Sequence, residues 1–276
     1  MQLLDFVWLC LSAAAAGGIN ALAGGGTLLT FPTLIGVLSR QSGSMAREAG
    51  VFANGTSTVA LVPASLGSAW GFRRELFALR KLLIWLVPPS LVGAAIGVAL
   101  VTRLPPQYFD ALVPWLILTA ATLFVLQPLL VKRKPVVVLE DGKPAATESG
   151  LASVTPLGLA GMVALQFCIA IYGGYFGAGI GILMLSGLGL MGLKNIHEMN
   201  GLKAVLGLAI NGVAAAGFVW EQKIHWPFAL AMMGTSTVGG YVVAQFSRKI
   251  PGAYVRYFVI VVGFSLAAYY FWQRLR

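Results

Sequence analysis

Long charge-free segments alternate with short polar stretches along the chain. The first segment, from Phe6 to Ser39, contains no charged residue. It is longer than the roughly 20 residues that one membrane helix needs, and too short for two such helices. Three charge-free segments of single-span length follow it: Ala49–Phe72, Leu82–Val101 and Ala111–Val131. The pattern predicts one overlong and three single membrane segments in the first part of the chain.

The same order returns after the polar stretch from Lys132 to Glu148. The later segments are Ser149–Leu193, which is again overlong, and then Met199–Trp220, Trp226–Ser247 and Tyr257–Gln273. We therefore predict an all-α polytopic membrane protein with two repeats of four hydrophobic segments. The predicted boundaries are a first transmembrane repeat at 1–131, a cytoplasmic linker at 132–148 and a second transmembrane repeat at 149–276.

Residue matches at corresponding positions indicate that the second half repeats the first. Leu22–Leu29 aligns with Phe176–Leu183, and both stretches are rich in glycine. Further matches are Arg47-Glu48 with His197-Glu198, Gly67 with Gly217, Trp70 with Trp220, Val92-Gly93 with Val238-Gly239, and Tyr108 with Tyr254. Repeats of this kind are typical of secondary transporters.

The basic residues change loops between the two halves. After the second segment, the first half has Arg73, Arg74, Glu75, Arg80 and Lys81, whereas the second half has Glu221, Lys223 and His225. After the third segment the bias reverses, with Arg103 and Asp110 against Arg248, Lys249 and Arg256. Because basic residues mark cytoplasmic loops, this reversal predicts inverted repeats.

Inverted repeats require an odd number of crossings in each half. Each overlong segment must then enter and leave on the same side, as a re-entrant hairpin broken at its glycines. Both termini are expected outside the cell, with the linker in the cytoplasm. Four full spans in each half, arranged as parallel repeats, are the alternative.

Composition narrows the class of protein. The 276 residues are 58% hydrophobic and 10% charged, whereas soluble domains carry about 25% charged residues, so an ordinary water-soluble enzyme is excluded. The net charge of +10 is expected of cytoplasmic loops, and a nucleic-acid partner is not predicted. The cysteines and histidines, Cys10, Cys168, His197 and His225, have no metal-like spacing. We predict no catalytic residue, no metal and no cofactor.

The glycine-rich centres of the overlong segments are the candidate binding site. A helix that starts after a break presents free backbone N–H groups and the positive end of its dipole, which suits an anion. Irregular backbone at membrane depth is tolerated where it lines a cavity or is buried in protein. Close packing of helices is the alternative role for these glycines. The candidate residues at and beside the breaks are Asn20, Gly24, Gly25, Gly26, Thr27, Tyr175, Gly177 and Gly179.

Polar residues in the following segments extend the candidate site. Lys203 lies within a predicted span, where a lysine costs about 2.5 to 3.5 kcal/mol at the bilayer centre. It is predicted to bind the anion together with Asn200. Alternatively, its side chain extends along the helix so that the ammonium group reaches the membrane interface. Asn54, Thr56, Ser57 and Thr58 of the first half are candidate donors, or alternatively form ordinary hydrogen bonds between helices.

Two glutamates recur at matching positions of the halves. Glu48 and Glu198 lie where the second segments begin. They are candidate proton-coupling residues, with helix capping and solvation at the interface as the alternative.

Five motifs carry a resemblance to a known family. They are Gly24–Pro32, Arg47–Thr58 and Ser68–Leu76 in the first half, and Met199–Lys203 and Ile224–Trp226 in the second. Together they resemble the TauE/SafE family of sulfite and organosulfonate exporters. The second glycine run departs from the triple-glycine form, because Ala178 and Ile180 replace glycines there.

The resemblance implies a multi-pass transporter of the plasma (inner) membrane. Its partners would be the lipid bilayer and a small sulfur-containing anion, sulfite or a short organosulfonate, moved outward. A homo-oligomer is possible. The alternatives are a membrane accessory or assembly factor that transports nothing, and an anion channel. The broken glycine segments and Lys203 favour a transporter, since an accessory protein has no need of polar groups at membrane depth.

Overall fold

In a computed structural model, the residues described are 3–22, 25–41, 43–71, 79–130, 156–190, 193, 196–246 and 252–275. They form eleven α-helices. The first half contributes α1 (Leu3–Leu22), α2 (Thr27–Leu38), α3 (Ser44–Arg47), α4 (Ala49–Gly71), α6 (Arg80–Arg103) and α7 (Pro106–Leu130). The second half contributes α8 (Pro156–Tyr175), α9 (Ile180–Leu190), α10 (Ile196–Trp220), α11 (Trp226–Phe246) and α12 (Gly252–Leu275). The predicted linker 132–148 and Gly24 lie outside the described residues.

Each predicted single-span segment is one helix. The predicted segment 82–101, for example, corresponds to α6, which begins at Arg80 and ends at Arg103. Within the described residues, three stretches are long and apolar enough to cross a membrane, namely Arg80–Arg103, Gly158–Tyr175 and Glu198–Trp220. The predicted all-helical, polytopic membrane class is thereby confirmed.

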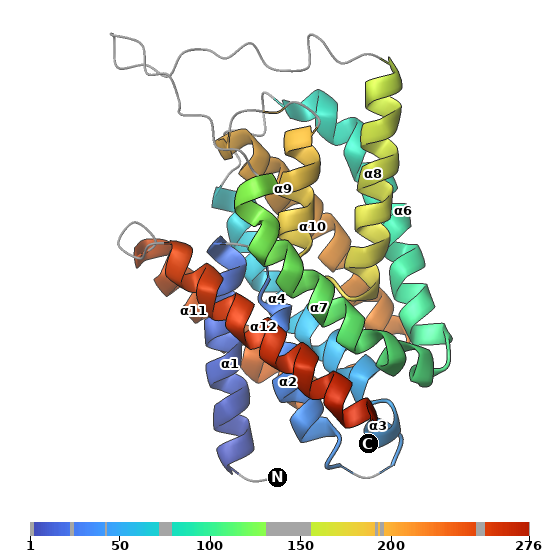
Figure 1. The fold of residues 1–276 in the computed structure, drawn as a ribbon, viewed down its shortest axis with the longest axis vertical. Helices are drawn as coiled ribbons and strands as arrows, with labels where there is room; N and C mark the ends of the chain where they lie inside the picture. The colour runs from blue at the N-terminus through green and yellow to red at the C-terminus, as the bar shows by residue number, and fades with distance from the viewer. Residues whose placement is uncertain are drawn as a thin grey trace.

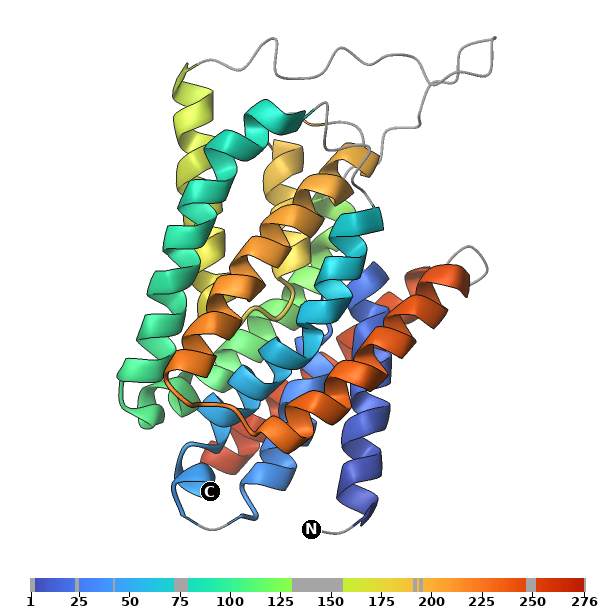
Figure 2. The same cartoon turned by 180° about the vertical axis from the view of Figure 1, so that it is seen from behind.

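Each overlong segment is two helices separated by a short break. The first forms α1 and α2, and the second forms α8 and α9. Figures 1 and 2 show α1 entering from the end where both chain termini lie, and α2 returning toward that end. They show α8 entering from the opposite end, where α7 finishes, and α9 returning toward it. The two breaks therefore point into the interior from opposite ends.

Helices of one half pack against helices of the other. The first helix of each broken pair contacts the opposite half, α1 along α11 and α8 along α6, while α4 packs on α10 and α7 on α12. Glycines allow very close approach: a Cβ atom added to Gly17 would lie 1.9 Å from the backbone oxygen of Ser236. One added to Gly97 would lie 2.3 Å from the backbone oxygen of Ile171. Small residues have this role in membrane helices, and here they fix the positions of α1 and α8.

The outer surface of the bundle carries large apolar side chains. Among them are Ile84, Leu230, Val238 and Val261, each more than half exposed. All seven tryptophans of the chain are exposed as well. Soluble monomers rarely expose so much apolar surface, and tryptophan is enriched at membrane interfaces. This surface is suited to contact with lipid.

Candidate substrate-binding site

The two helix breaks meet at a small cavity in the interior. It is lined by residues that flank the first break, by residues at the second break, and by residues of α4 and α10: Asn20, Thr27, Thr58, Leu61, Phe176, Gly177, Ile180 and Asn211. Its space for the centre of a water molecule is about 20 Å³, which is room for about one water. Polar side chains from both halves thus lie around one small cavity.

Both half-helices begin at this cavity. Thr27 is the first residue of α2 and Ile180 is the first residue of α9, and both line the cavity. A helix start carries about half a positive charge from its aligned peptide dipoles. Two such starts converge here, one from each half, so the cavity is electrostatically suited to an anion.

The second break depends on the backbone freedom of glycine. Gly177 and Gly179 have φ angles of +74° and +73°, in the left-handed region that glycine adopts without steric cost. The turn is closed by the Ile180 amide, which donates to the Gly177 carbonyl over 3.3 Å. The carbonyl of Ala178 accepts a hydrogen bond of 2.6 Å from the Tyr172 hydroxyl. These bonds hold Gly177 at the cavity wall.

Asn54 of α4 ties the first half to the second break. Its side-chain amide donates to the backbone oxygen of Tyr175 over 2.8 Å. The other side-chain atom, Oδ1, has no hydrogen-bond partner among the described residues, although Asn54 is only 1% exposed. A buried acceptor without a donor is costly, so this oxygen marks a point where a donor from water or a substrate would be accommodated.

Thr56 and Ser57 bond to other helices and loops and do not line the cavity. The Ser57 hydroxyl forms a hydrogen bond with the hydroxyl of Thr30 on α2. Thr56 Oγ1 accepts a hydrogen bond of 3.0 Å from the backbone N–H of His225, between α10 and α11. Both side chains thus form hydrogen bonds with other segments in this structure.

Lys203 and Asn200 lie on α10, away from the cavity wall. Lys203 is partly buried, and within the described part of the chain no residue forms an ion pair or hydrogen bond with it. A spacing of eight residues places Lys203 on the same helix face as Asn211, about 12 Å away along the axis. Gly207 lies between them on that face, and an added Cβ there would meet nothing within 4 Å. Lys203 is therefore a cation near the cavity without contact to it.

Glu48 and Glu198 both have partners. Glu48 forms an ion pair with Lys223, and the two side chains are 26% and 24% exposed. The Lys223 ammonium also lies 5.6 Å from the centre of the Phe52 ring. Glu198 interacts with another residue of the protein. Neither glutamate lines the cavity.

The structure brings together part of the predicted set. Asn20, Thr27 and Gly177 line the cavity, and Gly25, Gly26, Tyr175 and Gly179 lie within two residues of the lining. Asn211 also lines the cavity but is not among the predicted residues. An asparagine within an apolar helix, on the same helix face as Asn200, is a sequence signal that could have indicated it. Its side-chain amide donates to Ser65 Oγ over 3.4 Å.

A polar cavity between broken helices, inside a bundle with a lipid-facing surface, defines a multi-pass membrane transporter. Comparison with known proteins gives the particular family. The model of the family "Sulfite exporter TauE/SafE" matches residues 9–270, and the chain belongs to this family.

Two relatives cover almost the whole chain. A "Probable membrane transporter protein" of Haemophilus influenzae (strain ATCC 51907 / DSM 11121 / KW20 / Rd) is 26% identical over 258 residues, which cover 92% of this chain and 89% of that protein. A "Probable membrane transporter protein ORF9" of Sinorhizobium sp is 23% identical over 272 residues, covering 97% and 94% respectively. Both names agree with the class that the fold and cavity define.

Proposed function

We propose that this protein is a secondary transporter that exports a small sulfur-containing anion, sulfite or a short organosulfonate, across the plasma membrane. The observation that carries the proposal is the cavity at which the two helix breaks meet. Its two helix starts offer positive potential. The side chains of Asn20, Thr27, Thr58 and Asn211 add amide and hydroxyl donors for oxyanion oxygens.

The size of the cavity implies that the bound state is more open. Room for about one water is too small for an oxyanion with three oxygens. Binding therefore requires the two breaks to move apart. Asn54, whose Oδ1 has no hydrogen-bond partner among the described residues, lies beside the second break through its bond to the Tyr175 carbonyl. Bisulfite, the protonated form of sulfite, is able to donate a hydrogen bond to this oxygen when it carries its proton as a hydroxyl.

We propose that the halves are inverted repeats, each opening with a re-entrant hairpin. The entry of α1 and α8 from opposite ends supports this arrangement (Figures 1 and 2), as does the reciprocal packing of α1 on α11 and α8 on α6. With the charge distribution of the loops, the termini are outside and the linker is cytoplasmic. In a cysteine-free background, an impermeant reagent should label Gln2→Cys from outside and should not label Gly142→Cys. The opposite labelling would contradict this topology.

A path from the cavity toward the termini is traced on two helices. On α2, Thr27 lines the cavity, and Ile35 lines a larger pocket at the end where the termini lie. On α4, Thr58 lines the cavity and Gly50 lines that pocket. Each pair is eight residues apart, which keeps it on one helix face about 12 Å long. Phe31 and Asn54 stand at the midpoints of these two faces.

Three phenylalanine rings close this path. Phe31 lies 5.1 Å from Phe176 and 6.0 Å from Phe109 between ring centres, in edge-to-face contacts. None of the three is more than 2% exposed. We propose that this group, here called the phenylalanine cluster, is the gate on the side of the termini, and that it is closed in this structure.

The test is a flux screen with purified protein in proteoliposomes. Sulfite, sulfate, thiosulfate and methanesulfonate are offered, and saturable movement of sulfite or the sulfonate is expected. Asn211→Leu should lower the affinity for the anion about tenfold or more, because it removes a donor to a charged ligand. Leucine is chosen because Leu61 occupies the equivalent position of the first half. Gln166→Leu is the matched control, because that buried amide bonds to Ser90 at the α6–α8 contact, away from the cavity.

The alternatives give different results in the same screen. Flux that does not saturate indicates an anion channel. Neither flux nor binding, in a monodisperse and membrane-inserted protein, indicates an accessory factor. Equal effects of Asn211→Leu and Gln166→Leu would remove the cavity from the substrate path.

A further inference from the structure

One buried polar atom beside the path from the cavity to the termini has no partner. It is Oδ1 of Asn54 on α4, the one buried side-chain oxygen or nitrogen of the described residues that forms no hydrogen bond. Asn54 as a whole is 1% exposed. A buried acceptor without a donor is costly, and native proteins contain few of them. This oxygen therefore calls for an explanation.

The bond between Asn54 and α8 explains the nitrogen of the amide and not its oxygen. Tyr175 is the last residue of α8, so its carbonyl is among the four at the helix end that have no donor within the helix. Asn54 Nδ2 donates to this carbonyl over 2.8 Å. Because a carbonyl only accepts hydrogen bonds, turning the amide over would bring two acceptor oxygens together. Oδ1 is thus held on the other side of the amide, where it serves no bond to α8.

Asn54 lies at the level of the proposed gate. Thr58, four residues further along α4, lines the cavity, and Gly50, four residues before Asn54, lines the larger pocket. Residues four apart lie on the same face of a helix. The carbonyl to which Asn54 is bonded belongs to the residue before Phe176, a member of the phenylalanine cluster. An anion that moves from the cavity to the larger pocket therefore passes Asn54.

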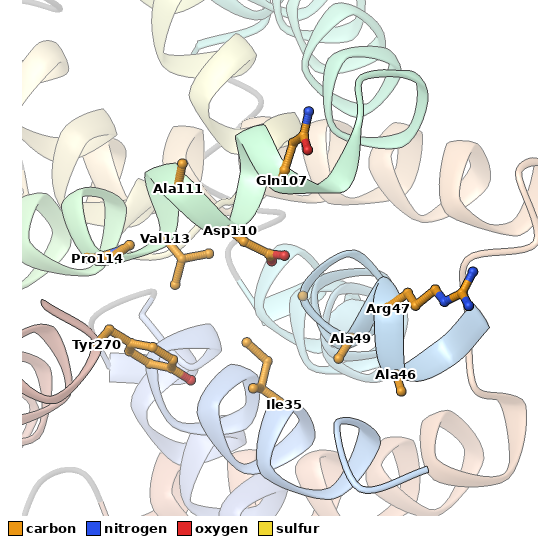
Figure 3. A pocket seen from close by; sticks show the side chains of 11 residues that line it. Ile35, Ala46, Arg47, Ala49, Gln107, Asp110, Ala111, Val113, Pro114 and Tyr270 are labelled. Atoms are coloured by element: carbon orange, nitrogen blue, oxygen red, sulfur yellow. The ribbon is translucent and has the colours of Figure 1, made fainter. Parts of the chain in front are cut away.

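The larger pocket is wide enough that selection is not made there. Its volume is about 460 Å³, which is room for many waters. Figure 3 shows Ile35, Asp110 and Tyr270, from three different helices, around the opening. The cavity at the helix breaks is also polar and lined by several donors. The packed segment between the two spaces, where Asn54 lies, is the part of the path with the closest contact between anion and protein.

The environment of Oδ1 changes when the gate opens. In this closed structure protein atoms fully cover the oxygen, so no water reaches it. Opening of the phenylalanine cluster brings water or the passing anion against it. An anion that displaces this water must replace its hydrogen bond, or it leaves the acceptor unpaired again. An anion that presents only acceptor oxygens also repels the partial negative charge of Oδ1.

We propose that Asn54 is the selectivity residue of the path, and that it favours small anions with a hydrogen-bond donor beside the charged group. The inference rests on the transport function proposed above and names its substrate class. Members of this class are bisulfite with its proton on oxygen, and short sulfonates that carry a hydroxyl or amino group. Sulfate, the sulfite dianion and unsubstituted alkanesulfonates offer no donor and pass poorly.

The repeat places this selection on one side of the membrane. The offset of 150 residues that aligns Gly67 with Gly217 aligns Asn54 with Ala204. The alanine side chain neither donates nor accepts a hydrogen bond. The second half therefore has no equivalent acceptor at this position, and the anion is selected at the gate on the side of the termini.

The experiment uses the full-length protein in proteoliposomes, with hydroxyethanesulfonate and propanesulfonate as probes. The two anions have the same charge and the same number of non-hydrogen atoms, and a hydroxyl in one replaces a methyl group in the other. The readout is the ratio of their fluxes at low concentration, after subtraction of the leak through protein-free liposomes. Inhibition of sulfite flux by each probe is the second readout. The wild type should favour the hydroxyl probe about tenfold or more, because the other probe leaves Oδ1 unpaired.

Asn54→Leu is the decisive variant, because leucine is similar in size and has no acceptor. The preference for the hydroxyl probe should fall to about twofold or less. A purely structural role of Asn54 would lower both fluxes and leave their ratio unchanged. Gln166→Leu is the matched control: it removes another amide that is 1% exposed, bonded to Ser90 at the α6–α8 contact. This control should keep the ratio of the wild type.

Each other result decides the proposal. Equal flux of the two probes in the wild type would show that water alone satisfies Oδ1, and it overturns the proposal while the transport function stands. A preference that persists in Asn54→Leu overturns the assignment to Asn54, as does sulfite flux that the hydroxyl probe neither accompanies nor inhibits. If neither sulfite nor either probe moves, the transport function fails and this proposal fails with it.

A second variant applies if Asn54→Leu does not fold. Asn54→Ala introduces the residue of the second half and leaves room for a water, which is able to donate as well as to accept a hydrogen bond. The preference should again fall to about twofold or less. An unchanged preference in this variant overturns the proposal.

Discussion

The first helix break contains Gly26 with a φ of −56°, whereas Gly177 and Gly179 of the second break have φ values of +74° and +73°. In the first break the glycine is required by its surroundings, because an added Cβ would lie 2.5 Å from the backbone oxygen of Ala16. In the second break, the nearest atom to a Cβ on Gly179 is 3.5 Å away, and the requirement is the backbone conformation. The glycines of the two breaks are thus required for different physical reasons.

The packing of the two broken pairs differs in a related way. Gly26, the N-cap of the second helix of its pair, lies against Ala16 of the first. In the other pair the larger residue is on the second helix: the Ile180 side chain occupies the space where a Cβ on Gly173 would lie, 2.1 Å from its Cδ1. The glycine at the close contact therefore stands at the start of the second helix in the first pair, and on the first helix in the second pair. This explains why Ile180 is accepted at the position aligned with Gly26.

The largest expected effect is that of Gly26→Ala. The new methyl group would overlap the backbone of α1, and overpacking of this kind costs about 1 to 3 kcal/mol and sometimes more. We expect a lower melting temperature of the purified protein in detergent, measured by loss of the monodisperse peak on heating. Gly36→Ala, within the helix that Gly26 caps, is the control, because an added Cβ there meets nothing within 4 Å. Equal melting of the two variants would contradict the steric explanation.

A smaller effect is expected for Gly179→Ala. A non-glycine residue held in the left-handed region costs roughly 1 to 2 kcal/mol, and asparagine tolerates that region better than alanine. Gly179→Asn should therefore melt at a higher temperature than Gly179→Ala. At Gly26 the order should reverse, because asparagine is larger and no left-handed φ needs support. The same order of variants at both sites would remove the distinction between the two breaks.

Much of the fold was predictable because its cause is local. The end of a charge-free run is set by the cost of placing charge in lipid, and the prediction 226–247 agrees with α11 to within one residue. The location of the breaks followed from segments too long for one span and rich in glycine. The reason for each glycine did not follow, since a φ angle or a close approach depends on the path of distant helices.

The site was predictable only in part, for a related reason. Asn20 and Thr27 line the cavity because they flank the first break. Thr56 and Ser57 are equally polar, but the rotation of α4 directs them to His225 and Thr30. Asn211 reaches the cavity because α10 presents that face to it. Which polar residue of a helix meets the cavity is decided by packing, and residue type alone does not give it.

The last comparison concerns the helices behind the two breaks, where an offset of 150 residues aligns Lys203 of α10 with Ala53 of α4. Only the second half therefore has a cation on this face. Lys203 does not line the cavity, so its effect on an anion there is exerted across space. A unit charge about 12 Å away contributes on the order of 1 kcal/mol at an effective dielectric constant near 20. A direct hydrogen bond to a charged group would contribute about 1.5 to 3 kcal/mol.

Lys203→Met is therefore expected to weaken anion binding about fivefold, the smallest of these effects. It keeps the apolar stem and removes the charge, and binding of sulfite to purified protein is the measurement. Lys203→Arg is the matched control: it keeps the charge and should bind within about twofold of the wild type, because a long-range interaction is insensitive to the geometry of the head group. A loss of a hundredfold in Lys203→Met, together with a similar loss in Lys203→Arg, would show instead that the ammonium touches the anion when the breaks open. In that case α10 must shift toward the cavity in the bound state, and the two halves would contribute unequally by direct contact as well as by charge.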